Sequence, residues 1–184
     1  MIFFVNILRK LLKIYYTAPL LNHPKSFIGK NLRLGDIHYF ELNQNAEKIT
    51  IGDDVKLNSE VNITVGNNAK LEIGEKTFFN KYTSIVALES ISIGENCLFG
   101  ENVKIYDNNH KIDIFNGVIK TNHYEFSTSP VKIGNNVWLA TNVTVLKGVT
   151  IGDNVVIGAG CVIHKDVPAN SVIVNKQEHK IISL

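Results

Sequence analysis

A histidine at position 110 stands where a six-residue repeat stops, in the segment YDNNHK. If Ile105 faces the interior of a strand, alternation turns Asn109 inward and His110 outward. Imidazole accepts a proton near neutral pH because its ordinary pKa is about 6.5. Residues 111–129 then lack the repeat, and a long insertion in a compact fold is usually functional. His110 beside this loop is typical of a general base that takes a proton from a bound acceptor.

Polar neighbours of His110 are candidates for supporting roles. Asp107 and Asn108 precede the histidine and either orient the base or the acceptor, or simply form a turn. His123 lies within the loop, where it could contact the acceptor, and it is the alternative base. The remaining histidines stand in no comparable setting and are expected at the surface: His23, His38, His164 and His179.

The repeat around this site predicts the architecture. Its hexads read IGENCL and FGENVK before the insertion, and IGNNVW, LATNVT, VLKGVT, IGDNVV and IGAGCV after it. The fifth place of each hexad lies two residues before the next first place, so both apolar side chains point to one interior. Residues such as Gly-Asp and Gly-Asn between these pairs tolerate tight corners. Three short strands per coil predict a triangular β-helix of about six coils, with Cys97 and Cys161 in its core.

Composition excludes several classes of protein. Nineteen basic and seventeen acidic residues give a net charge of +2, so no electrostatic case exists for a nucleic-acid partner. The two cysteines fit neither a metal site nor a CxxC motif, which favours a reducing compartment, the cytoplasm. No metal is expected.

The chain divides into three parts. Residues 1–22 are expected to form an amphipathic helix and linker, residues 23–174 the β-helix domain with the inserted loop, and residues 175–184 a tail. Basic residues interrupt the first segment, so it is too short in apolar length to span a bilayer. The favoured interpretation is that the helix covers the exposed end of the repeat. The second interpretation is peripheral contact with the inner membrane.

The stretch PVKIGNNVWLATNVTVLKGVTIGDNVVIGAGCVIHKDVPANSV resembles the hexapeptide-repeat acyltransferases, in particular the sugar O-acetyltransferases that use acetyl-CoA. The resemblance implies a left-handed parallel β-helix, whereas the general crossover rule alone favours a right-handed coil. It also implies that His110 removes the proton of an acceptor hydroxyl, whose oxygen attacks the acetyl thioester directly. A homotrimer with active sites between subunits is implied as well.

The same resemblance assigns binding residues. In FFNKYTSIV, Asn80 is implied to place the acceptor sugar, although a structural corner asparagine is an equal alternative. An exposed Trp138 would border a groove or a subunit interface. The implied contacts to acetyl-CoA lie in the C-terminal coils at Trp138, Ala140, Thr141, Gly158, Ala159 and Lys165.

The sequence departs from the maltose and galactoside enzymes of this type. Those enzymes carry acidic residues where this chain has Ala87 and Leu88, and proline where it has Lys111. The departure favours a surface polysaccharide or its precursor as the acceptor. An amino-sugar N-acetyltransferase is the alternative on the same scaffold. A zinc carbonic anhydrase would need three convergent histidines, and a non-catalytic scaffold would not need the loop after His110.

Overall fold

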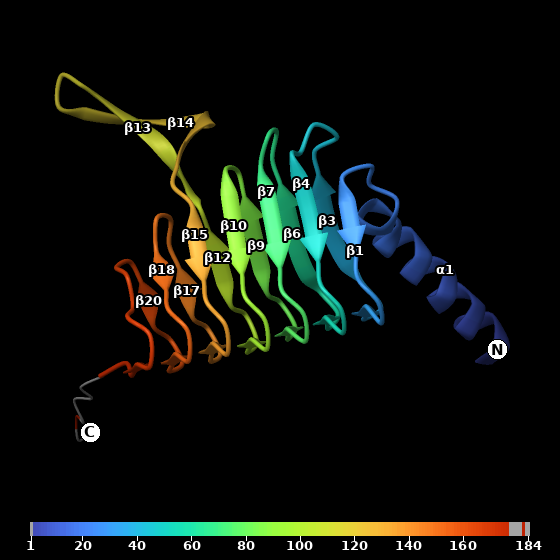
Figure 1. The fold of residues 1–184 in the computed structure, drawn as a ribbon. Helices are drawn as coiled ribbons and strands as arrows, with labels where there is room; N and C mark the ends of the chain where they lie inside the picture. Colours follow the sequence, from blue (N-terminus) through green and yellow to red (C-terminus); the bar gives the residue numbers. More distant parts are fainter. Residues whose placement is uncertain (1, 177–181, 183–184) are drawn as a thin grey trace.

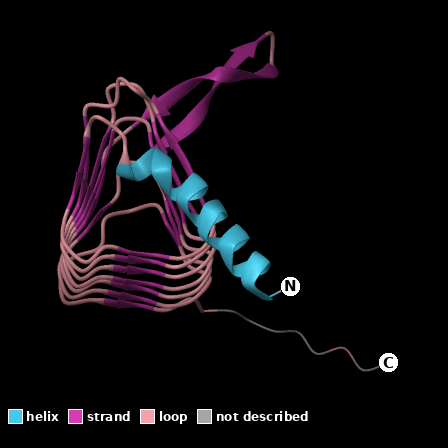
Figure 2. Cartoon of the chain, turned by 90° about the vertical axis from the view of Figure 1, so that its right-hand side faces the viewer, coloured by secondary structure: helices cyan, strands magenta, loops and turns pink. Residues whose placement is uncertain are grey.

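The computed structural model describes residues 2–176 and residue 182. Three parallel sheets form the sides of a triangular prism, and helix α1 (Ile2–Leu21) lies at one end (Figures 1 and 2). Successive strands pass from one sheet to the next, and six coils each contribute a strand to all three sheets. The predicted all-β helix of about six coils is confirmed.

Sheet A comprises β1 (Ser26–Ile28), β4 (Lys48–Ile51), β7 (Lys70–Ile73), β10 (Ser90–Ile93), β15 (Val131–Ile133) and β18 (Thr150–Ile151). Sheet B comprises β2 (Arg33–Leu34), β5 (Lys56–Leu57), β8 (Phe78–Phe79), β11 (Leu98–Phe99), β16 (Trp138–Leu139), β19 (Val156–Ile157) and β21 (Val172–Ile173). Sheet C comprises β3 (His38–Leu42), β6 (Val61–Val65), β9 (Ser84–Ala87), β12 (Lys104–Tyr106), β17 (Thr144–Val145) and β20 (Val162–Ile163).

The interior of the prism is a continuous stack of apolar side chains. Every coil places its first-place and fifth-place residues inward, and the stacked rings of Phe79 and Phe99 lie 4.6 Å apart. Cys97 and Cys161 are buried among these residues, as predicted, and burial raises the pKa of the Cys97 thiol. This stack makes the prism a rigid support for whatever its edges carry.

The corners adopt the same backbone conformation from coil to coil. Asn136 and Asn154 occupy equivalent corners with φ of 55° and 57°, a conformation that asparagine adopts more readily than most residues. The side chain of Asn136 donates to that of Asn154 at 3.1 Å, which links successive coils. At Gly74, a Cβ atom would lie 2.5 Å from the carbonyl carbon of Gly94, so the close stacking of coils requires glycine there.

The insertion is a β-hairpin rather than an irregular loop. Strands β13 (Asn108–Phe115) and β14 (Val118–Thr128) pair antiparallel and project from the prism (Figure 1). Asn116 and Gly117 form its two-residue turn with φ of 50° and 75°, the positive values that such a turn requires. The hairpin begins at Asn108, so His110 lies on the hairpin. The sequence had predicted that it lies at the end of a coil strand, and this prediction was wrong.

Helix α1 covers the first coil with only its C-terminal half, the segment that crosses the prism end in Figure 2. Thr17 and Leu20 are buried, and the Nζ atom of Lys13 donates to the carbonyl of Leu34 at 2.6 Å. In the described residues, none of the helices combines the length and apolar character needed to cross a bilayer. Most of the predicted tail, 177–181 and 183–184, lies outside the described residues, and His179 with it.

Candidate active site

Asp107 stabilises the junction between the prism and the hairpin. It occupies the inward place that follows Ile105, and its side chain is fully buried. Its carboxylate accepts hydrogen bonds from the backbone N–H groups of Leu88, Glu89 and Ser90 at 2.8 to 3.1 Å. A carboxylate held by three backbone donors is unavailable to an acceptor sugar. The predicted substrate-binding role of Asp107 is therefore corrected to a structural one.

Polar contacts of the next residues fix the base of the hairpin. The side chain of Asn108 donates to the carbonyl of Val86 at 3.0 Å and to the Asp107 carboxylate at 3.1 Å. On the other strand of the hairpin, Ser127 Oγ accepts a hydrogen bond from the Nζ atom of Lys147 at 2.6 Å. Asn108 thus serves the turn, which is one of the two roles predicted for it. Asn109 is exposed, contrary to prediction, because the inward and outward alternation of the coil ends at the buried Asp107 and hairpin strand β13 begins at Asn108.

The side chain of His110 is exposed to solvent near the start of the hairpin. Its Nδ1 atom lies 3.2 Å from the carbonyl oxygen of Asn122, and its ring lies 4.4 Å from that of Phe126. A carbonyl oxygen can only accept, so Nδ1 carries the proton in this contact. The Nε2 atom then keeps its lone pair and can accept a proton from an acceptor. The hairpin therefore selects the tautomer that a general base needs.

His123 lies on the opposite strand of the hairpin and is exposed. Across the hairpin, His110 is paired with Phe126, and its ring packs against that residue. The described hydrogen bonds include none from the ring of His123, so its tautomer is not selected in this way. His110 remains the better oriented of the two candidates.

Most of the residues predicted to bind acetyl-CoA gather on one edge of the prism. This B–C edge is the row of corners that joins sheet B to sheet C. Thr141 and Ala159 are exposed there on successive coils, and Gly160 N–H donates to the Thr141 carbonyl at 3.0 Å. Ala140 stands above Gly158 in the same way, because its N–H donates to the carbonyl of Ile157.

Two other predicted residues lie beside this edge. Trp138 is exposed on the outer face of β16, directly before the corner. Asn80 stands two coils away on the same edge, where its Oδ1 accepts from Asn58 Nδ2 at 2.8 Å and from Lys81 N–H at 2.9 Å. These bonds support the structural corner role, one of the two interpretations of Asn80, and its contact with an acceptor sugar stays a prediction.

Small side chains and free amides at this edge suit the coenzyme. The N–H groups of Thr141 and Ala159 have no hydrogen-bond partner in the described part of the chain. A pantetheine arm carries amide groups that would take such donors, and small residues let it approach the backbone closely. The residues present therefore fit acetyl-CoA.

The base and these residues lie on different edges. His110 and the exposed Lys165 follow strands of sheet C at its other margin, the C–A edge, where sheet C joins sheet A. About five residues of extended chain separate the two edges, a span of roughly 15 Å. A single chain therefore does not bring His110 to Thr141 and Ala159, and Lys165 is separated from the residues with which it was grouped.

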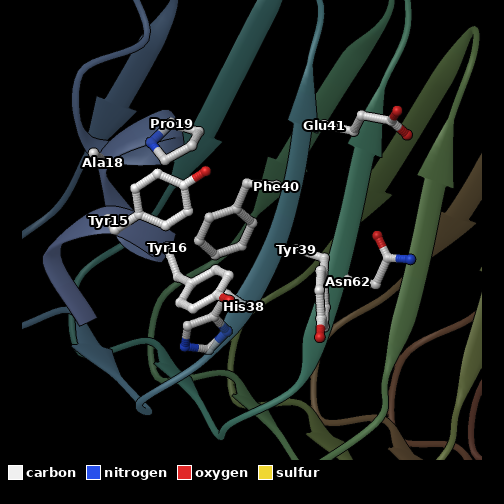
Figure 3. Close-up of a pocket in the computed structure, with 9 residues that line it drawn as sticks. All are labelled: Tyr15, Tyr16, Ala18, Pro19, His38, Tyr39, Phe40, Glu41 and Asn62. Carbon is white, nitrogen blue, oxygen red and sulfur yellow. The ribbon is translucent and has the colours of Figure 1, made fainter. Parts of the chain in front are cut away.

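A cavity of about 770 Å³ opens elsewhere, between α1 and strand β3 (Figure 3). None of the predicted active-site residues lines it. Its walls are mainly aromatic, and they are formed by Tyr15, Tyr16, Ala18, Pro19, His38, Tyr39, Phe40, Glu41 and Asn62.

Buried histidines correct the expectation that the minor histidines lie at the surface. His38 is 1% exposed and stacks on Phe40, and burial lowers its pKa to about 4. The carbonyls of Gly35 and Val61 lie near its ring, but neither ring nitrogen makes a hydrogen bond of good geometry, so desolvation dominates. His23 is also buried, and its Nδ1 accepts a hydrogen bond from the N–H of Lys25. His164 is exposed, as expected.

Comparison with known proteins decides the family. A model described as bacterial transferase hexapeptide (six repeats) matches residues 130–165, and one described as hexapeptide repeat of succinyl-transferase matches residues 90–105. The galactoside O-acetyltransferase of Escherichia coli strain K12 is 36% identical over 123 residues, which cover 67% of this chain and 58% of the relative. WbbJ of the same strain, a candidate lipopolysaccharide biosynthesis O-acetyl transferase, is 35% identical over 136 residues, covering 67% and 69%. The chain belongs to the hexapeptide-repeat acetyltransferase family.

A solved structure of this family agrees with the fold. The polysialic acid O-acetyltransferase OatWY has a TM-score of 0.54 and 26% identity, covering 85% of this chain and 80% of that one. The chain spans only 58% of the length of the galactoside O-acetyltransferase. The residues that the first family model matches, 130–165, include all six predicted coenzyme residues, from Trp138 to Lys165.

Proposed function

We propose that this hexapeptide-repeat protein transfers the acetyl group of acetyl-CoA to a hydroxyl of a saccharide, either a surface polysaccharide or its precursor. The geometry of His110 carries the proposal, because the bond to Asn122 leaves Nε2 free to accept a proton. Family membership supports acyl transfer, and the names of its relatives include sugar and polysaccharide acetyltransferases. With acetyl-CoA as the donor, we propose that the reaction takes place in the cytoplasm.

The mechanism assigns one proton to His110. Acetyl-CoA supplies an acetyl group activated as a thioester. Nε2 of His110 takes the proton of the acceptor hydroxyl while that oxygen forms a bond to the acetyl carbon and the carbon–sulfur bond breaks. The imidazolium then returns the proton to the departing thiolate. The contact with Asn122 holds the ring in place, and a positioned base of this kind contributes roughly 10²- to 10⁴-fold in rate.

An active site shared by two copies follows from the separation of the edges. The C–A edge of one copy would supply His110, and the B–C edge of its neighbour would supply Thr141 and Ala159. The hairpin supports this arrangement because it carries large apolar side chains that are exposed in the single chain. These are Ile112, Ile114, Phe115, Val118, Ile119 and Tyr124. A homotrimer is the closed assembly that we propose.

Acetyl transfer by the full chain tests the chemistry. Release of the coenzyme A thiol would be followed with hydroxyl-bearing and amino-bearing saccharides, including capsule-type oligosaccharides. We expect turnover with a hydroxyl acceptor, and a loss of about 10²-fold or more in kcat for His110→Ala. His123→Ala is the matched control and should retain most of the activity. Full activity in His110→Ala would exclude the proposed base, and faster transfer to amino acceptors would favour the N-acetyltransferase alternative.

Mixing two inactive variants tests the shared site. His110→Ala removes the base, and Ala159→Trp would block the exposed corner at the B–C edge. In randomly mixed rings, about one quarter of the interfaces combine an intact His110 with an intact Ala159. We therefore expect the mixture to regain about a quarter of the wild-type activity after subunit exchange. If the site were contained within one chain, mixed subunits would recover nothing.

A further inference from the structure

Helix α1 turns its polar side toward the prism. Lys13, Thr17 and Leu20 contact the first coil and, at ~100° per residue, fall on one side of the helix. Arg9 and Lys10 border this arc, one on each side. The N-terminal half of α1 extends past the prism, as Figures 1 and 2 show. Nearly all of the polar residues of α1 therefore lie on the side that carries the domain.

The opposite side of α1 is apolar and uncovered. Leu11 and Ile14 expose 58% and 65% of their surface, and Tyr15, which also borders the cavity between α1 and β3, exposes 73%. Val5, Ile7, Leu8, Leu12 and Leu21 are also exposed. Phe27, on the adjacent strand β1, adds another ring that is 62% exposed. A continuous apolar stripe of this size is a docking surface, since monomeric soluble proteins rarely leave one in water.

Charge identifies the kind of partner. Residues 1–45, which comprise α1 and the first coil, contain six of the nineteen basic residues and two of the seventeen acidic ones, Asp36 and Glu41, whereas the remainder carries thirteen basic and fifteen acidic residues. Lys25, Lys30 and Arg33 of this segment are exposed on the first coil, next to α1. Thus the end of the prism that carries the apolar stripe is positive, while the rest of the chain is net negative. An apolar stripe bordered by cations matches an anionic lipid surface.

We propose that α1 lies in the interface of an anionic membrane, with its apolar stripe among the acyl chains and Arg9 and Lys10 at the level of the headgroups. The prism then stands on its first coil, which is the end that carries the basic residues. The hairpin leaves the fourth coil, three strand spacings or roughly 15 Å farther along the axis. This places the C–A edge within reach of a saccharide attached to a lipid in the same membrane.

Vesicle co-sedimentation of the full chain tests the proposal. The probes are vesicles of phosphatidylcholine alone and of phosphatidylcholine with phosphatidylglycerol. We expect binding to the anionic vesicles that weakens in high salt, with at least a tenfold lower affinity for Leu8→Glu/Leu11→Glu. Arg9→Glu/Lys10→Glu should also bind more weakly to the anionic vesicles. Val172→Glu is the matched control, because Val172 is 71% exposed at the far end of the prism.

Two outcomes would overturn the assignment. One is binding of the helix variants to anionic vesicles as tightly as the wild-type protein. The other is a lower molar mass of Leu8→Glu/Leu11→Glu in light scattering without lipid, which would assign the stripe to a second copy of the chain. Circular dichroism would verify that each variant is folded. Acetyl transfer is not needed for the readout, so failure here is distinguishable from failure of the proposed enzymatic function.

Discussion

The carboxylate of Asp107 is buried and accepts hydrogen bonds from four donors. Asp107→Asn removes one of its two acceptor oxygens and leaves the size of the side chain unchanged. One carboxylate oxygen accepts from the N–H groups of Glu89 and Ser90, both at 2.8 Å. The other accepts from Leu88 N–H at 2.9 Å and from the side chain of Asn108 at 3.1 Å. An asparagine amide has one oxygen, and its NH₂ group would face the remaining donors. Whichever way the amide turns, about two donors lose their acceptor.

The loss in stability follows from these two donors. A buried donor left without a partner costs about 1–2 kcal/mol, so Asp107→Asn should lower the free energy of unfolding by about 2–4 kcal/mol. For a chain of 184 residues this corresponds to a fall in Tm of roughly 5–15 °C. The effect should be largest at the junction that carries the hairpin, because the donors belong to the corner between β9 and β10.

Urea and thermal unfolding, followed by circular dichroism, would measure this change. Asp153→Asn is the matched control, since Asp153 accepts from Asn135 N–H at an exposed corner. In the preceding coil, Asn135 itself does the same for Glu95 N–H. We expect the control to stay within about 0.5 kcal/mol of the wild-type protein. An equally small change for Asp107→Asn would refute the claim that the carboxylate locks this junction.

Two further predictions concern the prism itself. His38 binds a proton below pH 6.5 in the unfolded state but only near pH 4 in the folded state. The free energy of unfolding should therefore fall by up to about 3 kcal/mol as the pH decreases across this window. Urea titrations at pH 7 and 4.5 should show this loss, and His38→Leu should reduce it. Gly74→Ala should destabilise the protein by about 2 kcal/mol or more, because the new methyl group meets the backbone of Gly94. A Tm for Gly74→Ala equal to that of the wild-type protein would contradict the close stacking of these coils.

The repeat and its core were predictable because they depend on local rules. Alternation along a strand has a period of two, so a residue such as Val137 and its neighbour Leu139 must share the interior once the corners are placed. Each coil repeats this pattern, so an irregular hexad can still be assigned from the hexads on either side of it. His110 became the candidate base for the related reason that it stands where the repeat stops.

The hairpin had a sequence signal that was not used. Asn116 and Gly117 form the dipeptide that most strongly favours a two-residue turn between strands. Recognition of this turn would have predicted paired strands for residues 111–129. It would also have placed Asn109 and His110 on the hairpin, where the alternation of the coil no longer applies. The burial of Asp107 was likewise implied by its place two residues after Ile105.

Hydrophobic periodicity and corner residues are written into neighbouring positions of the chain, and for that reason the order of residues was enough to specify the prism. Contacts between coils are not local. The three backbone donors around Asp107 and the burial of His38 beneath α1 depend on residues that are distant in sequence. The distribution of His110 and Thr141 over opposite edges likewise emerges only when the coils are stacked, because the width of a sheet then separates them.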